Sequence, residues 1–325
     1  MPSLTTRWPD PTPEQLLAGF TPPPHFADAR FSTYRPQDPT QSAALDDLRA
    51  FASALEQPPK RRLFRAAEPL LGRYLDGGFG VGKTHLLASL WHAVRVPAAF
   101  GTFVGYTNLV GALGFNAVVD ALAAFRLVCI DEFELDDPGD TVLMSSLCMR
   151  LVERGVVLAA TSNTLPGQLG EGRFAADDFM REIQGLAAHF EVVRIDGQDY
   201  RHRVQVERNG GWADREVHAA LEGNATAVID HFDALLAHLS RVHPSRYREL
   251  LRDVTAIGLL DVHTMHDQAD ALRFVVLVDR LYDLDIAVYA SGVTLEQLFA
   301  PELLAGGYRK KYFRALSRIA ALHAD

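Results

Sequence analysis

Cysteine is scarce in this sequence, with only Cys129 and Cys148 among 325 residues. Two cysteines without CxxC or zinc-ligand spacing exclude a disulfide-stapled fold and a zinc ribbon. No apolar run reaches the roughly 18 residues that a membrane-spanning helix needs, and the first residues lack the apolar segment of a signal peptide. With reduced cysteines and no targeting segment, we expect a cytoplasmic protein.

Positive charge is also in the minority, since 32 lysines and arginines stand against 41 aspartates and glutamates, for a formal net charge of −9. This balance disfavours a protein that coats nucleic acid along its whole surface, because the phosphates would be repelled. Hydrophobic residues make up 48% of the chain, which is typical of a globular protein. At about 150 residues per domain, the length predicts about two domains or one large one.

The first half of the chain alternates strand-like and helix-like segments. Proline clusters in residues 1–40, where it removes backbone donors and predicts an extended arm on the surface. A helix is expected over residues 40–55, since apolar residues recur there at helical spacing. Strands are expected over residues 73–76, 98–104, 126–131, 156–161 and 191–195. This alternation predicts an α/β fold, with a parallel sheet between helices on both faces.

The second half begins with a different pattern. Residues 199–212 resemble a β-hairpin with a glycine turn, which suggests a boundary. After it we expect a long helix over 225–242, a strand over 257–262, a helix over 268–282, a strand over 286–291 and a last helix from 308. The predicted organisation is therefore an arm and helix (1–60), a core (61–198), and a hairpin with a second αβ unit and C-terminal helix (199–325).

One internal match links the two halves. Residues 127–161, shifted by 130, overlay residues 257–291 without a gap, so that Asp131 falls on Asp261 and Thr161 on Ser291. The 35 positions share seven identities, which either a decayed duplication or the common periodicity of two strand–helix–strand units explains. Because the second segment has no phosphate loop, no second nucleotide site is predicted there.

The strongest motif is a glycine-rich loop of the pattern GxxxxGK[ST], placed between an expected strand and an expected helix. Its glycines let backbone N–H groups curl round a phosphate, and the helix that follows adds its dipole. The lysine can reach the β- and γ-phosphates of ATP, and the threonine hydroxyl can ligate Mg²⁺. The candidate nucleotide-binding residues are Gly77, Gly78, Phe79, Gly80, Val81, Gly82, Lys83, Thr84 and His85, the last of which is expected to pack at the helix start.

Polar side chains end the next two buried-type strands. Asp131 and Glu132 close the strand over residues 126–131, at the sheet edge where ligands bind in parallel α/β folds. Asp131 would hold Mg²⁺, and Glu132 would orient and deprotonate the attacking water. Asn163 follows the strand over residues 156–161, where its amide could position water or touch the γ-phosphate.

An arginine that stabilises charge on the γ-phosphoryl oxygens would complete such a site, and a neighbouring subunit often supplies it. Arg173, Arg181 and Arg318 are the candidates. Spacing alone does not separate a catalytic arginine from a surface arginine.

The C-terminal segment departs from the overall charge. From residue 301 onward it carries five basic and two acidic side chains. Contact with an acidic protein, with anionic lipid at a membrane surface or with nucleic acid is one interpretation. The other is a lid helix that buries Phe313, Leu316 and Ile319 on one face. The pair His263-x-x-His266 lacks a third ligand nearby, so no catalytic zinc is expected.

The segments GGFGVGKTH, CIDEF and ATSN, with DYRHR, LVDRLYD and SRIAAL further along, together resemble the ZapE-like AAA+ ATPase family. This family comprises bacterial cell-division ATPases with mitochondrial relatives, and the resemblance extends from about residue 26 to residue 322. It implies a P-loop NTPase (AAA+) fold with a three-layer αβα core and a C-terminal lid. It also implies Mg²⁺-dependent ATP hydrolysis, a protein partner at the division ring and, in relatives, a role in protein quality control.

The same resemblance implies roles for single residues. Asp131 would bind Mg²⁺ together with the loop, Glu132 would drive hydrolysis and Asn163 would sense the γ-phosphate. Arg173 matches the family's arginine after the sensor strand, and Arg318 matches a lid-side sensor. Two departures affect these assignments: Glu134 stands where the family usually has Gln or His, and Ala320-Ala321 replaces acidic residues.

Three functions compete at this stage. The first is an ATP-driven enzyme that remodels a protein partner, with a homo-oligomer holding ATP between subunits. The second is an ATP-dependent nucleic-acid or helicase loader of the DnaC or IstB type, which shares GKTHL; the net charge and the lack of a helix-turn-helix weigh against it. The third is a scaffold that binds ATP without turnover, which the presence of Glu132 disfavours.

Overall fold

The chain folds into two compact units in the computed structural model, which describes residues 2–57, 70–78, 80–133, 138–164, 185–197 and 212–322. The core unit comprises Leu17–Pro22 and Phe26–His202. The second unit comprises Met1–Leu16, Pro23–His25 and Arg203–Asp325. The N-terminal segment thus contributes residues to both units.

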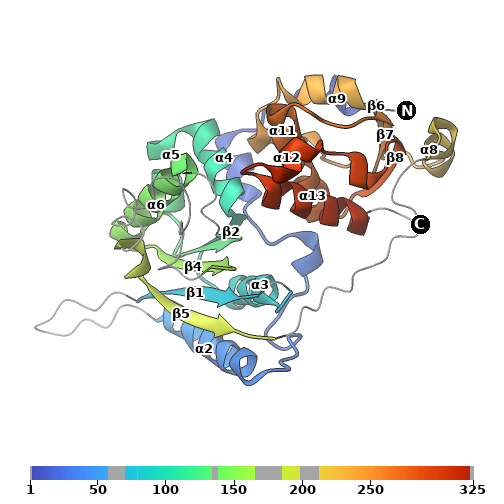
Figure 1. Ribbon diagram of the computed structural model, residues 1–325. Helices are drawn as coiled ribbons and strands as arrows, with labels where there is room; N and C mark the ends of the chain where they lie inside the picture. Colours follow the sequence, from blue (N-terminus) through green and yellow to red (C-terminus); the bar gives the residue numbers. More distant parts are fainter. Residues whose placement is uncertain are drawn as a thin grey trace, which may run out of the picture. The chain divides into compact units, whose positions relative to one another are not determined.

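A five-stranded parallel sheet forms the centre of the core unit (Figure 1). Its strand order is β2-β3-β4-β1-β5, and all neighbouring strands are parallel. β3 and β4 are buried along their whole length, as expected for apolar strands that are covered on both faces. The carboxyl ends of β1, β3 and β4 therefore meet at one edge. The strands are β1 (Gly72–Gly77), β2 (Ala98–Thr102), β3 (Leu127–Asp131), β4 (Val157–Ser162) and β5 (Phe190–Ile195).

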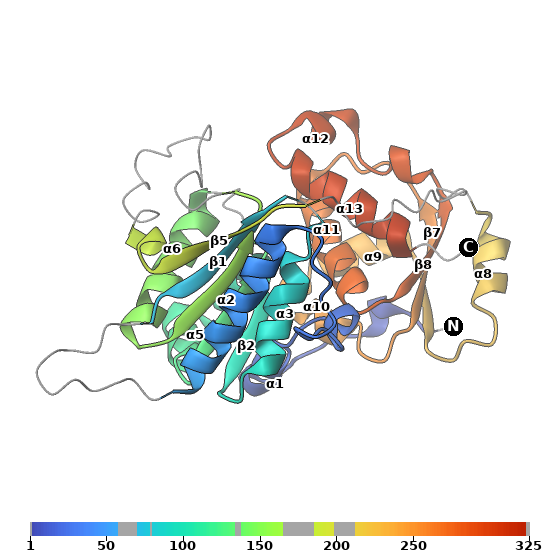
Figure 2. The ribbon, with the colours of Figure 1, turned by 90° about the horizontal axis from the view of Figure 1, so that it is seen from below.

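Helices cover both faces of this sheet, which confirms the predicted α/β fold (Figures 1 and 2). α2 and α3 pack on one face, and α4, α5 and α6 pack against one another on the other. α2 begins where the side chain of Asp38 accepts the N–H of Thr40 and Pro39 supplies a helical φ. The helices are α2 (Pro39–Glu56), α3 (Lys83–Ala93), α4 (Phe103–Leu113), α5 (Phe115–Leu122) and α6 (Pro138–Glu153).

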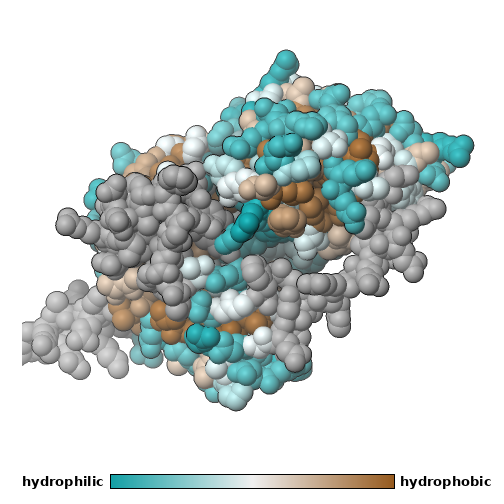
Figure 3. Space-filling view, in the orientation of Figure 1, coloured by the Kyte–Doolittle hydropathy of each residue, from teal (hydrophilic) through white to brown (hydrophobic). Residues whose placement is uncertain are grey.

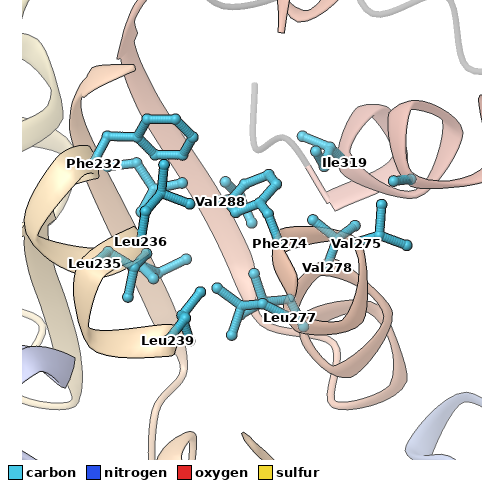
Figure 4. Close-up of a cluster of buried hydrophobic side chains, with 14 of the residues drawn as sticks. Phe232, Leu235, Leu236, Leu239, Phe274, Val275, Leu277, Val278, Val288 and Ile319 are labelled. Atoms are coloured by element: carbon cyan, nitrogen blue, oxygen red, sulfur yellow. The ribbon is translucent and has the colours of Figure 1, made fainter. Parts of the chain in front are cut away.

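The second unit contains a smaller parallel sheet of order β6-β7-β8. Figure 4 shows its main core, in which side chains of α9 face side chains of α11. No helix in the described part of the chain is long and apolar enough to cross a membrane. The elements are α8 (Asp214–Ala220), β6 (Ala227–His231), α9 (Phe232–Leu239), α10 (Tyr247–Leu250), β7 (Ala256–Val262), α11 (Gln268–Asp283), β8 (Ala287–Gly292), α12 (Pro301–Ala305) and α13 (Arg309–Leu322), with 3₁₀ turns at Pro244–Arg246 and Leu295–Gln297.

The proline-rich N-terminal segment is not the wholly extended surface arm that the sequence predicted. It contains α1 (Pro13–Ala18) and 3₁₀ turns at Leu4–Thr6 and Pro24–Phe26. Leu4 is completely buried in the core of the second unit, and its N–H donates to the carboxylate of Asp230 at 2.9 Å. Proline is compatible with the first turn of a helix, because the N–H that it lacks has no partner there.

Residues 225–242 are the other correction, because the expected long helix is β6 followed at once by α9. Val228 of β6 is aligned in parallel with Ile257 of β7. A short apolar run suits a buried strand as well as a helix, so periodicity did not separate the two. The hairpin predicted over residues 199–212 lies outside the described residues except for Trp212, and it stays a prediction.

Candidate nucleotide-binding and hydrolysis site

The glycine-rich loop connects β1 to α3 at the carboxyl edge of the core sheet. Gly80 and Gly82 have φ angles of +69° and +89°, which side chains with a Cβ rarely adopt. A Cβ on Gly82 would also lie 2.7 Å from the ring of Tyr34. Phe79 lies outside the described residues. The turn before α3 thus depends on glycine, as expected of a loop that brings backbone N–H groups close to a phosphate.

Lys83 and Asn163 lie together beside this loop. The ammonium Nζ of Lys83 donates to the backbone oxygen of Gly77 at 2.7 Å and to the oxygen of Gly78. It also donates to Oδ1 of Asn163 at 2.9 Å, although the two residues are 80 positions apart. Lys83 is only 9% exposed. The structure therefore brings the loop lysine and the amide that follows β4 to one place.

Oxygen atoms that could ligate a metal come together at Asp131, the last residue of β3. The Thr84 hydroxyl donates to Oδ1 of Asp131 at 3.1 Å, and the Thr161 hydroxyl donates to the same oxygen at 2.5 Å. No group of three His, Cys, Asp or Glu side chains that could hold a metal occurs among the described residues. Mg²⁺ needs no such cage, because one or two protein oxygens with water and phosphate ligands suffice. Thr84 and Asp131 therefore fit Mg²⁺.

Glu132 follows Asp131 in a left-handed backbone conformation, with φ at +54°. For a residue with a side chain this conformation costs about 1–2 kcal/mol. Two hydrogen bonds offset the cost: the N–H of Glu132 donates to the Thr161 hydroxyl at 3.0 Å, and the N–H of Phe133 donates to the Thr161 carbonyl at 2.7 Å. The chain turns sharply after β3, and the candidate base follows the candidate metal ligand at the sheet edge.

Tyr34 was not found by sequence reasoning, although it contacts the loop directly. Its hydroxyl donates to the carbonyl of Val81 at 3.0 Å, and its ring packs against Gly82. The residue is buried, with 8% of its surface exposed. Nothing in the local pattern of a proline-rich segment indicates a contact 47 residues along the chain. The aromatic residues Phe26, Phe31 and Tyr34 stand close together before α2, but this pattern does not indicate which of them contacts the loop.

His85 packs at the start of α3, as expected. Its Nε2 lies 3.1 Å from the Thr33 hydroxyl and 3.3 Å from the carbonyl of Arg30, and its ring lies 5.6 Å from that of Tyr34. Burial lowers the pKa of His85, against an opposing effect of the Arg30 carbonyl. The side chain is thus neutral at pH 7 and braces the N-terminal segment.

Asp76 is a second residue that the sequence did not single out. It is the last residue but one of β1, is 7% exposed, and has a pKa raised by burial. The charges of Arg194 and Lys83 act in the opposite direction. An acidic residue directly before a phosphate loop was the signal that could have found it.

Of the three candidate arginines, only Arg318 belongs to the described residues. Arg173 and Arg181 lie outside the described residues. Arg318 belongs to α13 of the second unit, where its guanidinium donates to Oδ1 of the buried Asp279 and lies 5.1 Å from the ring of Tyr282. Arg314 donates to the other oxygen of Asp279 at 2.8 Å. Burial would raise the pKa of Asp279, but the two arginines together hold it below its usual value.

The parallel sheet, the phosphate loop and the acidic end of β3 define a P-loop ATPase of the AAA+ class. The model of the AFG1-like ATPase family matches residues 11–221 and 212–325 of the chain. The protein therefore belongs to the AFG1-like ATPase family, and the resemblance inferred from its motifs is confirmed.

Individual relatives span different shares of the chain. Cell division protein ZapE of Escherichia coli strain K12 is 26% identical over 310 residues, which cover 79% of each chain. Lactation elevated protein 1 homolog B of Danio rerio is 26% identical over 159 residues, covering 42% of this chain and 31% of that protein. Among solved structures, the DnaC helicase loader (18% identity, TM-score 0.40) covers 53% of this chain and 99% of its own. AMPPCP-bound DnaA from Aquifex aeolicus (13% identity, TM-score 0.41) covers 52% and 50%.

Proposed function

We propose that the protein hydrolyses ATP to ADP and phosphate at the carboxyl edge of the core sheet, with Mg²⁺ as cofactor. The observation that carries the proposal is the meeting of Lys83, Asn163 and Asp131 at the ends of β1, β3 and β4. Lys83 reaches Asn163, and Thr84 reaches Asp131, through direct hydrogen bonds. A phosphate-binding cation, a hard oxygen pair and an acid thus lie within one small region.

Binding of the triphosphate is assigned to the loop. Its backbone N–H groups and the N-terminus of the 11-residue helix α3 favour an anion. The Lys83 ammonium, now bound to loop carbonyls, would exchange these partners for phosphate oxygens. Thr84 and Asp131 would hold Mg²⁺, which when bound neutralises charge on the β- and γ-phosphates.

Proton removal from the attacking water is assigned to Glu132. A carboxylate at this position can accept the proton while Asn163 orients the water or the γ-phosphate. Arg173 stays the candidate for stabilising the charge that spreads over the γ-phosphoryl oxygens, and Arg318 the candidate for a lid-side contact. For Arg318 that contact would require release from Asp279, the partner that it has in the second unit.

The test of this assignment is the nucleotide that remains bound after incubation with ATP and Mg²⁺. We expect the wild type to yield ADP and phosphate, and Glu132→Gln to retain intact ATP with its affinity unchanged. Removing Mg²⁺ with a chelator should abolish turnover by the wild type. If Glu132→Gln forms ADP as fast as the wild type, Glu132 is not the base.

The partner is also a matter of proposal. We propose that the ATPase remodels a protein partner at the division ring in the cytoplasm, and the similarity to Cell division protein ZapE supports the division role. On α13, Arg309, Lys310 and Phe313 are exposed, the last by 55%, and Figure 3 shows hydrophobic surface beside hydrophilic surface in this region. We therefore propose an acidic protein segment as the partner of this mixed basic and apolar face, with arginine and aromatic residues of the kind enriched at protein interfaces.

Trapping separates these partners. Glu132→Gln loaded with ATP should recover a protein partner and elute as a larger homo-oligomer by light scattering. Binding of DNA that weakens steeply with salt would instead favour the helicase-loader alternative. Flotation with vesicles of anionic lipid would favour peripheral membrane contact.

A further inference from the structure

Thr161, the fifth residue of β4, connects the two acidic residues of the candidate site. Its hydroxyl donates to Oδ1 of Asp131 at 2.5 Å and accepts the N–H of Glu132 at 3.0 Å. A threonine hydroxyl has one proton and two lone pairs, so it can serve both neighbours at the same time. With 2% of its surface exposed, Thr161 forms these bonds without competition from bulk water.

The backbone of Thr161 supports the same turn. Its carbonyl accepts the N–H of Phe133 at 2.7 Å, so Thr161 holds the two N–H groups that follow Asp131. The turn places Glu132 at φ +54°, and this backbone angle sets the direction in which the Glu132 side chain leaves the chain. Branching at Cβ restricts Thr161 to few rotamers, which favours a fixed hydroxyl position.

We propose that Thr161 is a positioning residue for ATP hydrolysis. Its hydroxyl fixes the carboxylate of Asp131 and the backbone turn of Glu132, and so sets the geometry of the metal ligand and the base together. Thr161 touches neither nucleotide nor water in this account and acts only through the two acids. The inference rests on the proposed function of Asp131 and Glu132.

The second unit contains a turn similar to that of Glu132, in a segment without a phosphate loop. Asp261, near the end of β7, has φ +56°, and its N–H donates to the Ser291 hydroxyl of β8 at 3.1 Å. Ser291 is the residue that the 130-position shift places on Thr161. The left-handed residue is offset by one position from Glu132, and β7 has a register irregularity between Leu259 and Val262. The Ser291 hydroxyl donates to Asp214, whereas that of Thr161 donates to Asp131. Ser291→Ala therefore measures the structural value of a buried hydroxyl that holds such a turn and a carboxylate outside the candidate site.

The test uses three variants of the full chain. Thr161→Val keeps the shape and removes the hydroxyl, Thr161→Ser keeps the hydroxyl, and Ser291→Ala removes the matched hydroxyl of the second unit. We expect Thr161→Val to lower kcat about 10- to 100-fold, as loss of a supporting contact does in metal sites. Its affinity for ATP without Mg²⁺ should stay within about twofold of the wild type, because the loop is intact.

The other two variants are controls, one for the hydroxyl itself and one for stability. Thr161→Ser should recover kcat to within about threefold of the wild type, since both bonds can form again. Ser291→Ala should lower the thermal midpoint as Thr161→Val does while leaving kcat unchanged. The gain in ATP affinity on adding Mg²⁺ should fall in Thr161→Val alone.

Three results would overturn the positioning role: an unchanged kcat in Thr161→Val, a Thr161→Ser variant as slow as Thr161→Val, or an equal loss of kcat in Ser291→Ala. A wild type that releases no phosphate would overturn the proposed hydrolysis instead. In that case the Mg²⁺-dependent gain in affinity still tests whether Thr161 orients Asp131.

Discussion

The carboxyl edges of the two parallel sheets are built alike and equipped differently. In the core sheet, Glu132 turns after β3 with its N–H on Thr161. In the second sheet, Asp261 turns near the end of β7 with its N–H on Ser291. Both acids have positive φ, at +54° and +56°. An acidic residue with a left-handed backbone, whose N–H is bound by a hydroxyl of the next strand, is thus a way to turn the chain. It does not by itself indicate catalysis.

The difference lies in β1, which pairs with β4 on the side away from β3 and leads into the phosphate loop. In the core unit, five residues separate β1 from α3, and they form the glycine-rich loop that holds Lys83. In the second sheet, β6 corresponds to β2, since each passes directly into a helix, and no strand of the described sheet β6-β7-β8 takes the place of β1. His231 instead pairs with Asp261 at 3.0 Å. We infer that nucleotide chemistry depends on the loop after β1, whereas the acidic turn is common to both edges.

The largest expected effect on ATP binding comes from Lys83→Ala, which removes the loop cation. Loss of a buried, hydrogen-bonded charge typically costs about 2–5 kcal/mol, so ATP affinity should fall at least about 30-fold. Equilibrium binding of labelled ATP measures the effect, and Lys311→Ala in the second unit is a control of the same residue type. Binding of one ATP per chain with unchanged affinity in Lys83→Ala would mean that the nucleotide is held outside the loop, and the comparison would be broken.

A smaller effect is expected from Tyr34→Phe. The Tyr34 hydroxyl holds the Val81 carbonyl, and in a planar trans peptide the N–H of Gly82 points the opposite way, where the loop can offer it to phosphate. Loss of one such bond costs about 0.5–1.5 kcal/mol, so ATP affinity should fall about two- to tenfold.

The matched control for Tyr34→Phe is Tyr106→Phe. Tyr106 is fully buried in the same unit, and its hydroxyl donates to the carbonyl of Cys129 at 3.1 Å. Both variants should lose similar thermal stability, and only Tyr34→Phe should lose affinity for ATP. If the two variants bind ATP with equal affinity, the Tyr34 hydroxyl does not contribute to nucleotide binding.

The smallest expected effect concerns the pH dependence of the second edge. Hydrogen bonds to Asp233 and then to the carbonyl of Thr264 raise the pKa of His263 above 6.5. The protonated imidazole is therefore favoured by folding, so its stabilisation is complete below pH 6.5 and disappears as the pH rises through the raised pKa. Because the His263 side chain is 49% exposed, solvent screening limits this stabilisation to about 0.5 kcal/mol.

Denaturant unfolding of the wild type and His263→Gln at about pH 5.5 and about pH 8.5 measures this contribution. The two proteins should differ in stability at the lower pH and agree at the higher pH. ATPase activity should not differ between them at either pH, because His263 lies outside the core unit. A difference in stability that grows with pH would contradict the assignment.

Local patterns were sufficient for most elements of the core sheet. The strand expected over residues 126–131 is β3, Leu127–Asp131, and the one over 156–161 is β4, Val157–Ser162. Apolar runs bounded by polar residues mark such buried strands well. β6 was missed because its apolar residues continue into α9 at a spacing that also suits a helix.

The residues of the candidate site also fall into those that local patterns predict and those that they do not. The loop residues and Asp131 follow from a contiguous motif, and chain order placed Asn163 at the same edge. Tyr34 and Thr161 could not be found, because their roles arise from contacts 47 and 30 residues along the chain. For Arg318, a motif match suggested a contact with nucleotide, but the sequence gave no indication that the structure would pair this residue with Asp279.

The central claim is that one of the two edges hydrolyses ATP. It is tested most directly by measuring steady-state phosphate release for Glu132→Gln beside Asp261→Asn. Both substitutions neutralise an acid with positive φ at the end of a parallel strand. We predict that Glu132→Gln loses at least about 100-fold in kcat, as expected for removal of a general base, while Asp261→Asn matches the wild type. Similar rates for the two variants would contradict this account.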